Sequence, residues 1–506
     1  MTEFNFLQSL PSVAPEIGLT ILAVVVLLLD VYLPENQRRT IAYVTAVGLA
    51  LLAITPIIWA PPAAGAGAEN LLYWGGMVRH DTLAQIFKVM VLLAGSLSSL
   101  MAIDVKGLGR RGEFYLIIVV STLGATLISG AADLIMVFLG LETLSIPLYV
   151  LAAFNRNDAR SAEGGMKYFL FGSFASALML FGFSILYGFS GQTNLYAIAD
   201  QLSVGLGSTP IPVLVAMVLV VVGFGFKIGA VPFHFWTPDM YEGAPTPVTA
   251  FVSVASKAAS FALLMRFLIA VFPNTLVLGN QDIQSFWVQL AAAMAVISMT
   301  LGNVLALSQR NIKRLLAYSS IAQAGYTLIG VAAIQAQAPL DQAQAVASVG
   351  FYMFMYVFTN ILAFAVVVLF SEATGSETIA DLAGLNRRSP WLALTLTVAL
   401  LSLAGIPPAA GFFGKFFLFN AAVKSGLAWL AIVGVLNSIV ALYYYLVVIK
   451  VMYVDRSPDE DKPIPMSSAS GWVLGIPTVL VLVLGTIGAQ VVFNWAVAGA
   501  VSLFAS

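Results

Sequence analysis

GFGFKIGAVPFHFWTPDMYEGAPTPVTAFVSVASK, residues 223–257, is the stretch that decides the fold. It lies between two strongly apolar runs, yet it holds two lysines, one histidine, two acids and four prolines. Ionisable groups at membrane depth are costly and normally face the interior of a helix bundle. Prolines and glycines that break a helix there require protein or water to satisfy the freed backbone groups. The stretch therefore predicts a broken helix that lines an ion pathway inside a membrane protein.

The rest of the chain has the composition of a polytopic membrane protein. Its 506 residues are 60% hydrophobic and 9% charged, with a mean hydropathy of +0.95, whereas a soluble domain has roughly 25% charged residues. The net charge of −1 gives no reason to expect a nucleic-acid partner. The chain has no cysteine, which excludes disulfides and thiolate-bound zinc or iron–sulfur centres. We therefore expect no redox chemistry by this chain alone.

Apolar runs recur from end to end, and a transmembrane helix needs roughly 20 apolar residues. We expect an all-α polytopic protein with one transmembrane domain, residues 1–506, and about fourteen spans. No basic segment precedes the first apolar run, so Ile17 onward is expected to be a retained helix and not a signal peptide. The connections 190–209 and 452–470 are expected to be loops. The spans are centred on 17–33, 41–60, 82–103, 113–129, 132–153, 165–189, 210–229, 246–272, 285–306, 314–334, 345–370, 390–407 continuing through 411–423, 427–451 and 471–498.

Basic residues predict the orientation, because they are enriched in the connections on the inner side of a membrane. With both termini outside, the outer connections hold only Arg79 and Lys424. Lys88, Arg266 and Lys450 lie near helix ends, where snorkelling to the interface is the expected explanation. The inner connections then hold Arg38, Arg39, Lys106, Arg110, Arg111, Arg156, Arg160, Arg310, Lys313, Arg314, Arg387, Arg388, Arg456 and Lys462.

Four ionisable residues stand inside apolar spans and are the primary candidates for proton transfer. Glu142 lies about ten residues, or about 15 Å, into its span. Lys227 is in the last turns of the span before the break, and Lys257 shares a helix face with several serines. Lys415 stands among phenylalanines after a second break. A desolvated lysine is able to gain and lose a proton, and a nearby carboxylate changes how readily it does so.

Two further residues are secondary candidates with plainer alternatives. Lys167 opens its span on the inner side and is equally explained as an ordinary inner-side basic residue. His234 lies at the first break and has the titration range of a proton relay, but a histidine in an aromatic loop is also a common packing residue. The segment SQRNIKRLLAYSSIAQAGY, residues 308–326, adds a polar stripe that predicts hydrogen bonds between helices.

The break at residues 225–238, GFKIGAVPFHFWTP, is matched by a second one at residues 403–417, LAGIPPAAGFFGKFF. Both combine glycine, proline, aromatic residues and a lysine. We therefore expect two repeats, residues 113–272 and residues 285–451, each containing five spans and one broken helix. An odd number of spans gives the two copies opposite orientations, which is the inverted-repeat plan of ion transporters.

These motifs together resemble the antiporter-like membrane subunits of NADH–quinone oxidoreductase, the respiratory complex I, and subunit N most closely. The resemblance covers nearly the whole chain. Its carriers are GLETLSIPLY (140–149), AEGGMKYFLFGSFASA (162–177), GFKIGAVPFHFWTPDMYEGAPTPVTAF (225–251), RLLAYSSIAQAGY (314–326) and GIPPAAGFFGKF (405–416).

The resemblance implies a proton-translocating role. Glu142 and Lys227 would form the central pair, Lys257 would lie on the hydrophilic axis, and Lys415 would be the terminal proton-exchanging residue. The complex uses NADH, or ferredoxin, and quinone at sites on other subunits. The resemblance thus implies that this chain itself binds no metal and no cofactor. The partners implied are other membrane-arm subunits, including neighbouring antiporter-like subunits, and the lipid bilayer. The implied location is the bacterial plasma membrane or a thylakoid membrane.

Two alternatives come from other functional classes. An Mrp-type sodium/proton antiporter subunit would favour a carboxylate where this chain has Lys415. A purely structural membrane subunit would tolerate replacement of Glu142 and Lys227 without loss of function.

Overall fold

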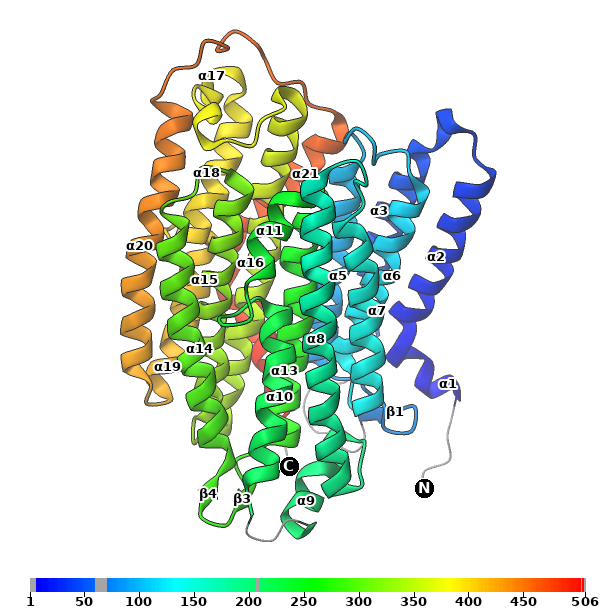
Figure 1. Cartoon of the computed structure of the whole chain (residues 1–506), viewed down its shortest axis with the longest axis vertical. Coiled ribbons are helices and arrows are strands. Elements are labelled where there is room, and N and C mark those ends of the chain that lie inside the picture. The colour runs from blue at the N-terminus through cyan, green and yellow to red at the C-terminus, as the bar shows by residue number, and fades with distance from the viewer. Residues whose placement is uncertain (1–5, 60–70, 206–208, 502, 505–506) are drawn as a thin grey trace.

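The computed structural model describes residues 6–59, 71–205, 209–501 and 503–504. This part of the chain is a bundle of helices that lie side by side along one axis, with α2 at one edge and α20 at the other (Figure 1). The first elements are α1 (Phe6–Ser9), η1 (Leu10–Val13), α2 (Ala14–Tyr32), η2 (Glu35–Gln37), α3 (Arg39–Leu52), α4 (Thr55–Ile58), β1 (Leu72–Tyr73), β2 (Val78–Arg79), α5 (Thr82–Ala102), α6 (Gly112–Gly130), α7 (Leu134–Ala152), α8 (Ala159–Ser190) and α9 (Leu195–Gly205).

The elements around the first break are α10 (Ile211–Ile228), α11 (Trp236–Gly243), α12 (Thr246–Phe251), the π-helical turn η4 (Val252–Ser256) and α13 (Lys257–Val271). The remaining elements are β3 (Val277–Leu278), β4 (Gln281–Asp282), α14 (Ile283–Ala306), α15 (Ile312–Ala332), η5 (Ala333–Gln335), α16 (Pro339–Thr374), η6 (Ile379–Leu382), α17 (Leu385–Arg388), α18 (Pro390–Ala404), α19 (Ala410–Lys424), α20 (Ala428–Tyr453), α21 (Ser468–Leu484) and α22 (Ala489–Val501).

The all-α membrane architecture is confirmed. In the described part of the chain, twelve helices are long and apolar enough to span a membrane, and the bent pair α21–α22 brings the number to thirteen if it counts as one span. The expected count of about fourteen is not confirmed. The remaining expected span, 390–423, consists of α18 and α19, which are 15 residues each and are separated by the second break.

One expectation about an individual segment was wrong, and one expected span has a shape that the sequence did not predict. The connection 190–209 is not only a loop, because it contains the 11-residue helix α9. The last span is not straight: α21 and α22 meet at an angle of 83°. The backbone is tightly packed beside this bend, since a side chain at Gly485 would place its Cβ 1.9 Å from the Pro408 carbonyl oxygen. The end of α21 thus rests directly on the backbone of the second break.

Burial divides the helices into a core and a lipid-facing shell. The span α12–α13 and the helices α15 and α16 are almost entirely buried, whereas α2 and α20 expose many apolar side chains. A helix that is apolar all round belongs inside a membrane bundle, and lipid-facing positions require no polar groups. The two breaks therefore pack on one side against a core of buried helices, although Phe235 at the first break and Pro408 at the second are exposed on the surface of the chain.

The two ends of the bundle differ. One end carries most of the basic residues. There, ion pairs link segments that are distant in sequence: Arg39 pairs with Asp104, and Arg387 pairs with Glu460. This end lies at the top of Figure 1, near α17, and the hairpins β1–β2 and β3–β4 lie at the opposite end. At the opposite end Gly499 of α22 packs on Thr82, the first residue of α5. The connections that were predicted to be inner therefore share one end of the bundle.

Candidate functional site

The first break follows directly from its sequence. Helix α10 ends at Gly229, whose φ of 68° is the left-handed conformation that glycine adopts without a Cβ penalty. Pro232 has no backbone N–H and so cannot pair with the carbonyl of Ile228. The break leaves Lys227 in the last turn of α10. A side chain at Gly229 would place its Cβ 3.7 Å from Nζ of Lys257, so the break lies between two of the candidate lysines.

Lys227 is buried and is held by hydroxyl groups of α7. Only 3% of the residue is exposed. Its Nζ donates a short hydrogen bond to the Ser145 hydroxyl and lies 3.5 Å from the Tyr149 hydroxyl. The ring of Tyr149 is also near, with its centroid 5.7 Å from the ammonium. The sequence therefore placed this lysine correctly inside the protein, but not its immediate partners.

Glu142 lies on α7 one turn before Ser145 and within electrostatic range of Lys227. The two charged groups form no direct ion pair in the described structure, because the Lys227 ammonium contacts the Ser145 hydroxyl instead. Oε1 of Glu142 is buried and has no hydrogen-bond partner among the described residues. The structure therefore brings the two predicted partners onto neighbouring helices in an open arrangement.

Lys257 occupies the point where the π-helical turn η4 meets α13. π-helical turns inside α-helices are rare and often mark functional sites. Only 2% of Lys257 is exposed. Its Nζ donates to the carbonyl oxygen of Ser320 at 2.8 Å and to its hydroxyl at 2.5 Å. That hydroxyl also contacts the hydroxyls of Tyr356, at 2.8 Å, and Tyr241, at 3.1 Å. The serine that binds the Lys257 ammonium thus lies on α15 and not on the helix of Lys257 itself.

Lys415 lies beside the second break, and 5% of it is exposed. Helix α18 ends at Gly405, whose φ is 88°. Because Pro408 has no backbone N–H, the Ala404 carbonyl has no helical donor four residues later. Nζ of Lys415 donates to that carbonyl at 2.9 Å and lies 4.4 Å from the ring centroid of Tyr326. An ammonium near a helix C-terminus and over an aromatic face is favourably placed.

Polar side chains of α15 lie between Lys257 and Lys415. The hydroxyls of Ser319 and Tyr445 are 2.5 Å apart. Nε2 of Gln323 donates to the Leu403 carbonyl at 3.1 Å and lies 3.4 Å from the Tyr445 hydroxyl, while its Oε1 accepts from Tyr352. The predicted stripe of interhelical hydrogen bonds is therefore present on α15, and it joins this helix to α16, α18 and α20.

The secondary candidate Lys167 lies in a separate network. Its side chain is 37% exposed and pairs at 2.6 Å with both Glu163 and Asp239. Asp239 also pairs with Arg314 at 2.7 Å. These ion pairs fasten the short helix α11 between α8 and α15. The structure therefore places Lys167 in a partly exposed ionic network and not beside Lys227 or Lys257.

The other secondary candidate, His234, is buried at the first break. Its ring lies 4.6 Å from the ring of Phe235, centroid to centroid, and its Nδ1 has no hydrogen-bond partner among the described residues. The described hydrogen bonds do not connect it to the three lysines. Its position is that of a packing residue with one free ring nitrogen.

A second group of buried charges was not predicted. Arg266 binds Asp81 through two hydrogen bonds, at 2.7 and 2.9 Å, and Arg79 also pairs with Asp81, at 3.1 Å. Lys88 pairs with Glu16 at 2.9 Å. The expectation that Lys88 and Arg266 snorkel was wrong, because each is only 1% exposed. A lone basic residue near a helix end is compatible with both outcomes, and only the tertiary partner decides between them.

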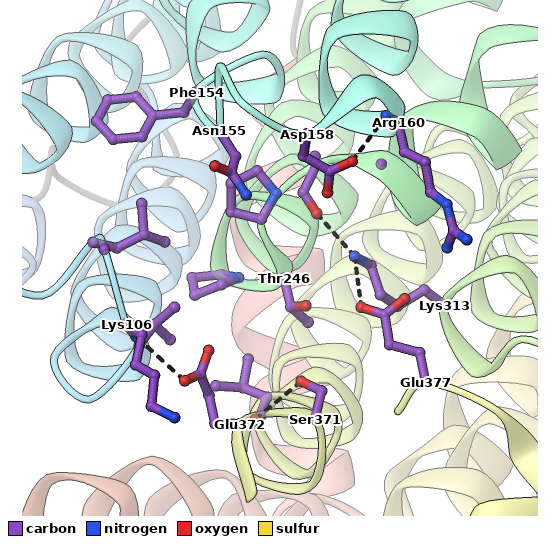
Figure 2. Close-up of a pocket in the computed structure, with 18 of the residues that line it drawn as sticks. Lys106, Phe154, Asn155, Asp158, Arg160, Thr246, Lys313, Ser371, Glu372 and Glu377 are labelled. Carbon is purple, nitrogen blue, oxygen red and sulfur yellow. Dashed lines mark hydrogen bonds and ion pairs between the residues drawn. The ribbon is translucent and has the colours of Figure 1, made fainter. Parts of the chain in front are cut away.

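A polar cavity of about 820 Å³ opens at the basic end of the bundle. Figure 2 shows Lys313 between Glu377 and the chain near Asp158, with Lys106 and Glu372 on the other side of the cavity. Lys313 pairs with Glu377 at 3.1 Å and donates to the Ala244 carbonyl at 2.9 Å. The cavity also touches residues 245–247, which begin the span that carries Lys257. No sequence motif indicated it, because five separate connections build its wall.

The chain is similar to known membrane proteins over most of its length. Residues 131–441 match the family model described as NADH:quinone oxidoreductase/Mrp antiporter, transmembrane. The chain is 41% identical to NADH-quinone oxidoreductase subunit N of Moorella thermoacetica over 490 residues, which is 96% of each chain. It is 43% identical to NAD(P)H-quinone oxidoreductase subunit 2 of Trichormus variabilis over 453 residues, 89% of this chain and 83% of the relative.

Solved structures give the same result. A chain of respiratory complex I from Thermus thermophilus superposes with a TM-score of 0.75 at 31% identity, over 94% of this chain and 98% of the other. A chain of the Mrp complex from a Dietzia species superposes with a TM-score of 0.82 at 20% identity, over 99% and 98%, and this likeness concerns the fold alone. The family match and the 41% identity over nearly the full length show that the chain belongs to the family of NADH–quinone oxidoreductase subunit N.

Proposed function

We propose that this chain is a proton-translocating, non-redox subunit of the membrane arm of an NADH–quinone oxidoreductase. The observation that carries the proposal is the set of three buried lysines, Lys227, Lys257 and Lys415, which bind hydroxyls or backbone carbonyls. In the described part of the chain none of the three forms an ion pair. Burying a charge without a counter-charge is expensive, and a buried lysine readily exchanges its proton. A merely structural interior would be cheaper to build from apolar residues.

The proposed path runs across the bundle. Closing of the Glu142–Lys227 pair would favour a proton on Lys227, and its opening would release that proton toward Lys257. From Lys257 the hydroxyl groups along α15 lead toward the second break and Lys415. The open arrangement of Glu142 and Lys227 supports the proposal, since a permanent ion pair would hold the charge in place.

The redox chemistry belongs elsewhere in the complex. The relatives are named as quinone oxidoreductase subunits that use NADH or NAD(P)H. We propose that the electron donor and quinone bind other subunits and that this chain binds no cofactor. Its partners are then other membrane-arm subunits, including neighbouring antiporter-like subunits, and lipid. The location is a bacterial plasma or thylakoid membrane, and the basic end of the bundle is proposed to face inward, with both termini outside.

We also propose that residues 113–272 and 285–451 are two inverted repeats. The similarity of the two breaks supports this division: each combines a helix that ends at a left-handed glycine, a proline three residues later and a neighbouring buried lysine. In this proposal the two repeats supply the two halves of the path.

The Mrp-type sodium/proton antiporter is the second candidate, and the fold similarity to the Mrp complex favours it. The identity of 20% in that comparison, against 41% to subunit N, weighs for the quinone oxidoreductase. A sodium site would also require oxygen ligands. Of the four central ionisable groups described above, only Glu142 is a carboxylate and the other three are lysines. A proton path is therefore the better reading of the interior.

The test is Lys227→Ala in the intact complex, reconstituted into vesicles, with proton uptake driven by NADH and electron transfer measured in parallel. Lys424→Ala is the matched control, because Lys424 is an exposed lysine that pairs with Asp341 at 3.3 Å. We expect Lys227→Ala to lower the number of protons taken up per electron pair and Lys424→Ala to leave it unchanged. Wild-type proton uptake in Lys227→Ala would refute the path.

A further inference from the structure

The second break frees two neighbouring carbonyl groups. In an α-helix the carbonyl of residue i accepts from the N–H four residues later. For Leu403 and Ala404 the residues at those positions are Pro407 and Pro408, which have no N–H. Both carbonyls are inside the protein, where an unpaired acceptor is costly. Two side chains therefore have to supply the missing donors.

One of these donors is Lys415, on the Ala404 carbonyl, and the other is Gln323, on the Leu403 carbonyl. Gln323 is fully buried. Its amide group is held from three sides: Nε2 meets Leu403 of α18 and Tyr445 of α20, and Oε1 accepts from Tyr352 of α16. An amide whose donors and acceptor are all engaged has one favourable orientation.

We propose that Gln323 is a positioning residue for Lys415. Because Gln323 donates to the Leu403 carbonyl, the Ala404 carbonyl is the one unpaired acceptor that remains for the Lys415 amine. The lysine is thereby held at one place relative to the Ser319–Tyr445 pair. This inference rests on the proposed role of Lys415 in proton transfer and adds the group that determines where its amine lies.

A glutamine suits this task because it donates and accepts without carrying a charge or a proton of its own. A carboxylic acid at the same place could satisfy the Leu403 carbonyl only when protonated. A leucine would fill the space but would leave that carbonyl free to compete for the lysine.

The chain contains a matched control for the amide contact. Gln335, in η5, donates to the Ser425 carbonyl at 3.0 Å, at the end of α19 far from the break. Gln335→Leu removes the same kind of bond from a helix end without touching the lysine. Any effect of Gln323→Leu beyond that of Gln335→Leu is therefore specific to position 323.

The experiment measures proton uptake per electron pair in vesicles that contain the intact complex, for Gln323→Leu, Gln335→Leu, Lys415→Ala and the double variant Gln323→Leu/Lys415→Ala. The amount of the complex is checked in each preparation. We expect Gln323→Leu to lower uptake per electron pair, by no more than Lys415→Ala does, and Gln335→Leu to have no such effect. In the Lys415→Ala background, Gln323→Leu should cause no further loss, because residues that act through one another are non-additive.

Gln323→Glu tests the positioning role through the pH dependence of proton uptake, which would not change if Gln323 only filled space. The titratable side chains around it are Tyr352 of α16, Tyr445 of α20 and, beyond the freed carbonyls, Lys415 of α19. We expect its uptake relative to wild type to approach 1 at low pH, where the acid donates to the Leu403 carbonyl, and to fall toward that of Gln323→Leu at high pH.

The outcomes separate the two proposals. Normal uptake in Lys415→Ala would overturn the proposed role of Lys415 and this inference with it. Impaired uptake in Lys415→Ala, combined with normal uptake in Gln323→Leu or with equal losses in Gln323→Leu and Gln335→Leu, would overturn the inference alone. Additive losses in the double variant, or a flat pH profile for Gln323→Glu, would do the same.

Discussion

Asp81 offers the sharpest stability prediction, because one carboxylate serves several buried groups. Its side chain caps α5 by accepting from the Ala84 N–H at 2.8 Å. It also holds the guanidinium groups of Arg266 and Arg79, and all three side chains are almost completely buried. Asp81→Ala removes the cap and leaves two buried cations without their shared anion.

The expected cost follows from these contacts. Loss of a helix cap costs about 1 kcal/mol, and leaving a buried charge unpaired costs about 3–5 kcal/mol. Asp81→Ala should therefore lower the free energy of unfolding by about 4–6 kcal/mol. Asp81→Asn keeps an oxygen for the cap and should lose about 1 kcal/mol less. Adding Arg266→Gln to Asp81→Asn removes one uncompensated charge and should restore part of the loss.

The absence of cysteine from the chain makes a clean assay available. Ser98 lies on α5, is fully buried, and its hydroxyl has no partner among the described residues, so Ser98→Cys is a mild reporter substitution. The intact complex in detergent is heated with a maleimide-linked polymer, and the epitope-tagged chain is followed as a mass shift on a blot. The temperature of half-maximal labelling should fall in the order wild type, Asp81→Asn, Asp81→Ala. Equal temperatures for wild type and Asp81→Ala would refute the reasoning.

The same variants have a predicted pH dependence. Burial raises the pKa of Asp81, but Arg266, Arg79 and the Ala84 N–H outweigh that effect and leave the pKa below its ordinary value. A carboxylate with a lowered pKa stabilises the fold above its unfolded pKa, and that stability is lost as the pH falls through the folded pKa. The difference in the temperature of half-maximal labelling between wild type and Asp81→Asn should therefore be constant from about pH 6 to 8. It should shrink only below about pH 4. A difference that changes between pH 6 and 8 would contradict this assignment.

Two further predictions concern the breaks. Ser320→Ala removes the hydroxyl that lies 2.5 Å from Nζ of Lys257 but keeps the backbone acceptor. We expect this variant, measured in vesicles, to take up fewer protons per electron pair while electron transfer is retained. Unchanged proton uptake would show that this hydroxyl is not part of the path. Gly485→Ala forces a Cβ against the Pro408 carbonyl oxygen and should cost about 1–3 kcal/mol or more, measured with the labelling assay. Gly471→Ala, within α21, meets no atom within 4 Å and should cost little. Equal effects of the two substitutions would refute the close packing of Gly485 on the second break.

The sequence predicted burial better than it predicted partners. Lys227 and Lys415 each stand alone in an apolar segment, and that pattern has few solutions other than an interior position. Their partners depend on how α7 and α18 are rotated toward them, which no local pattern records. For this reason the hydroxyl of Ser145 and the carbonyl of Ala404 were not foreseen, and the expected contact of Lys227 with Glu142 is open in the structure.

Departures from the expected path of the chain have the same origin. The breaks at Gly229 and Gly405 were predicted because their prolines and glycines are adjacent in sequence. The bend after α21 was not predicted. Gly485 beside it packs on the backbone of Pro408, far earlier in the chain, and no local pattern records such a contact. The repeat boundaries and the roles of the lysines remain predictions until the variants described above are measured.

The carbonyl of Ala404 has a consequence for what happens when Lys415 changes its charge. A carbonyl oxygen only accepts, and an amine donates to it both as NH₃⁺ and as NH₂. The contact at 2.9 Å therefore survives loss of the proton, so the side chain has no need to swing away in either state. A carboxylic acid at the same position would donate to that carbonyl only when protonated, and the hydrogen bond would be lost when the acid ionises. The backbone of the second break thus allows the Lys415 amine to gain and lose a proton without a change in its position.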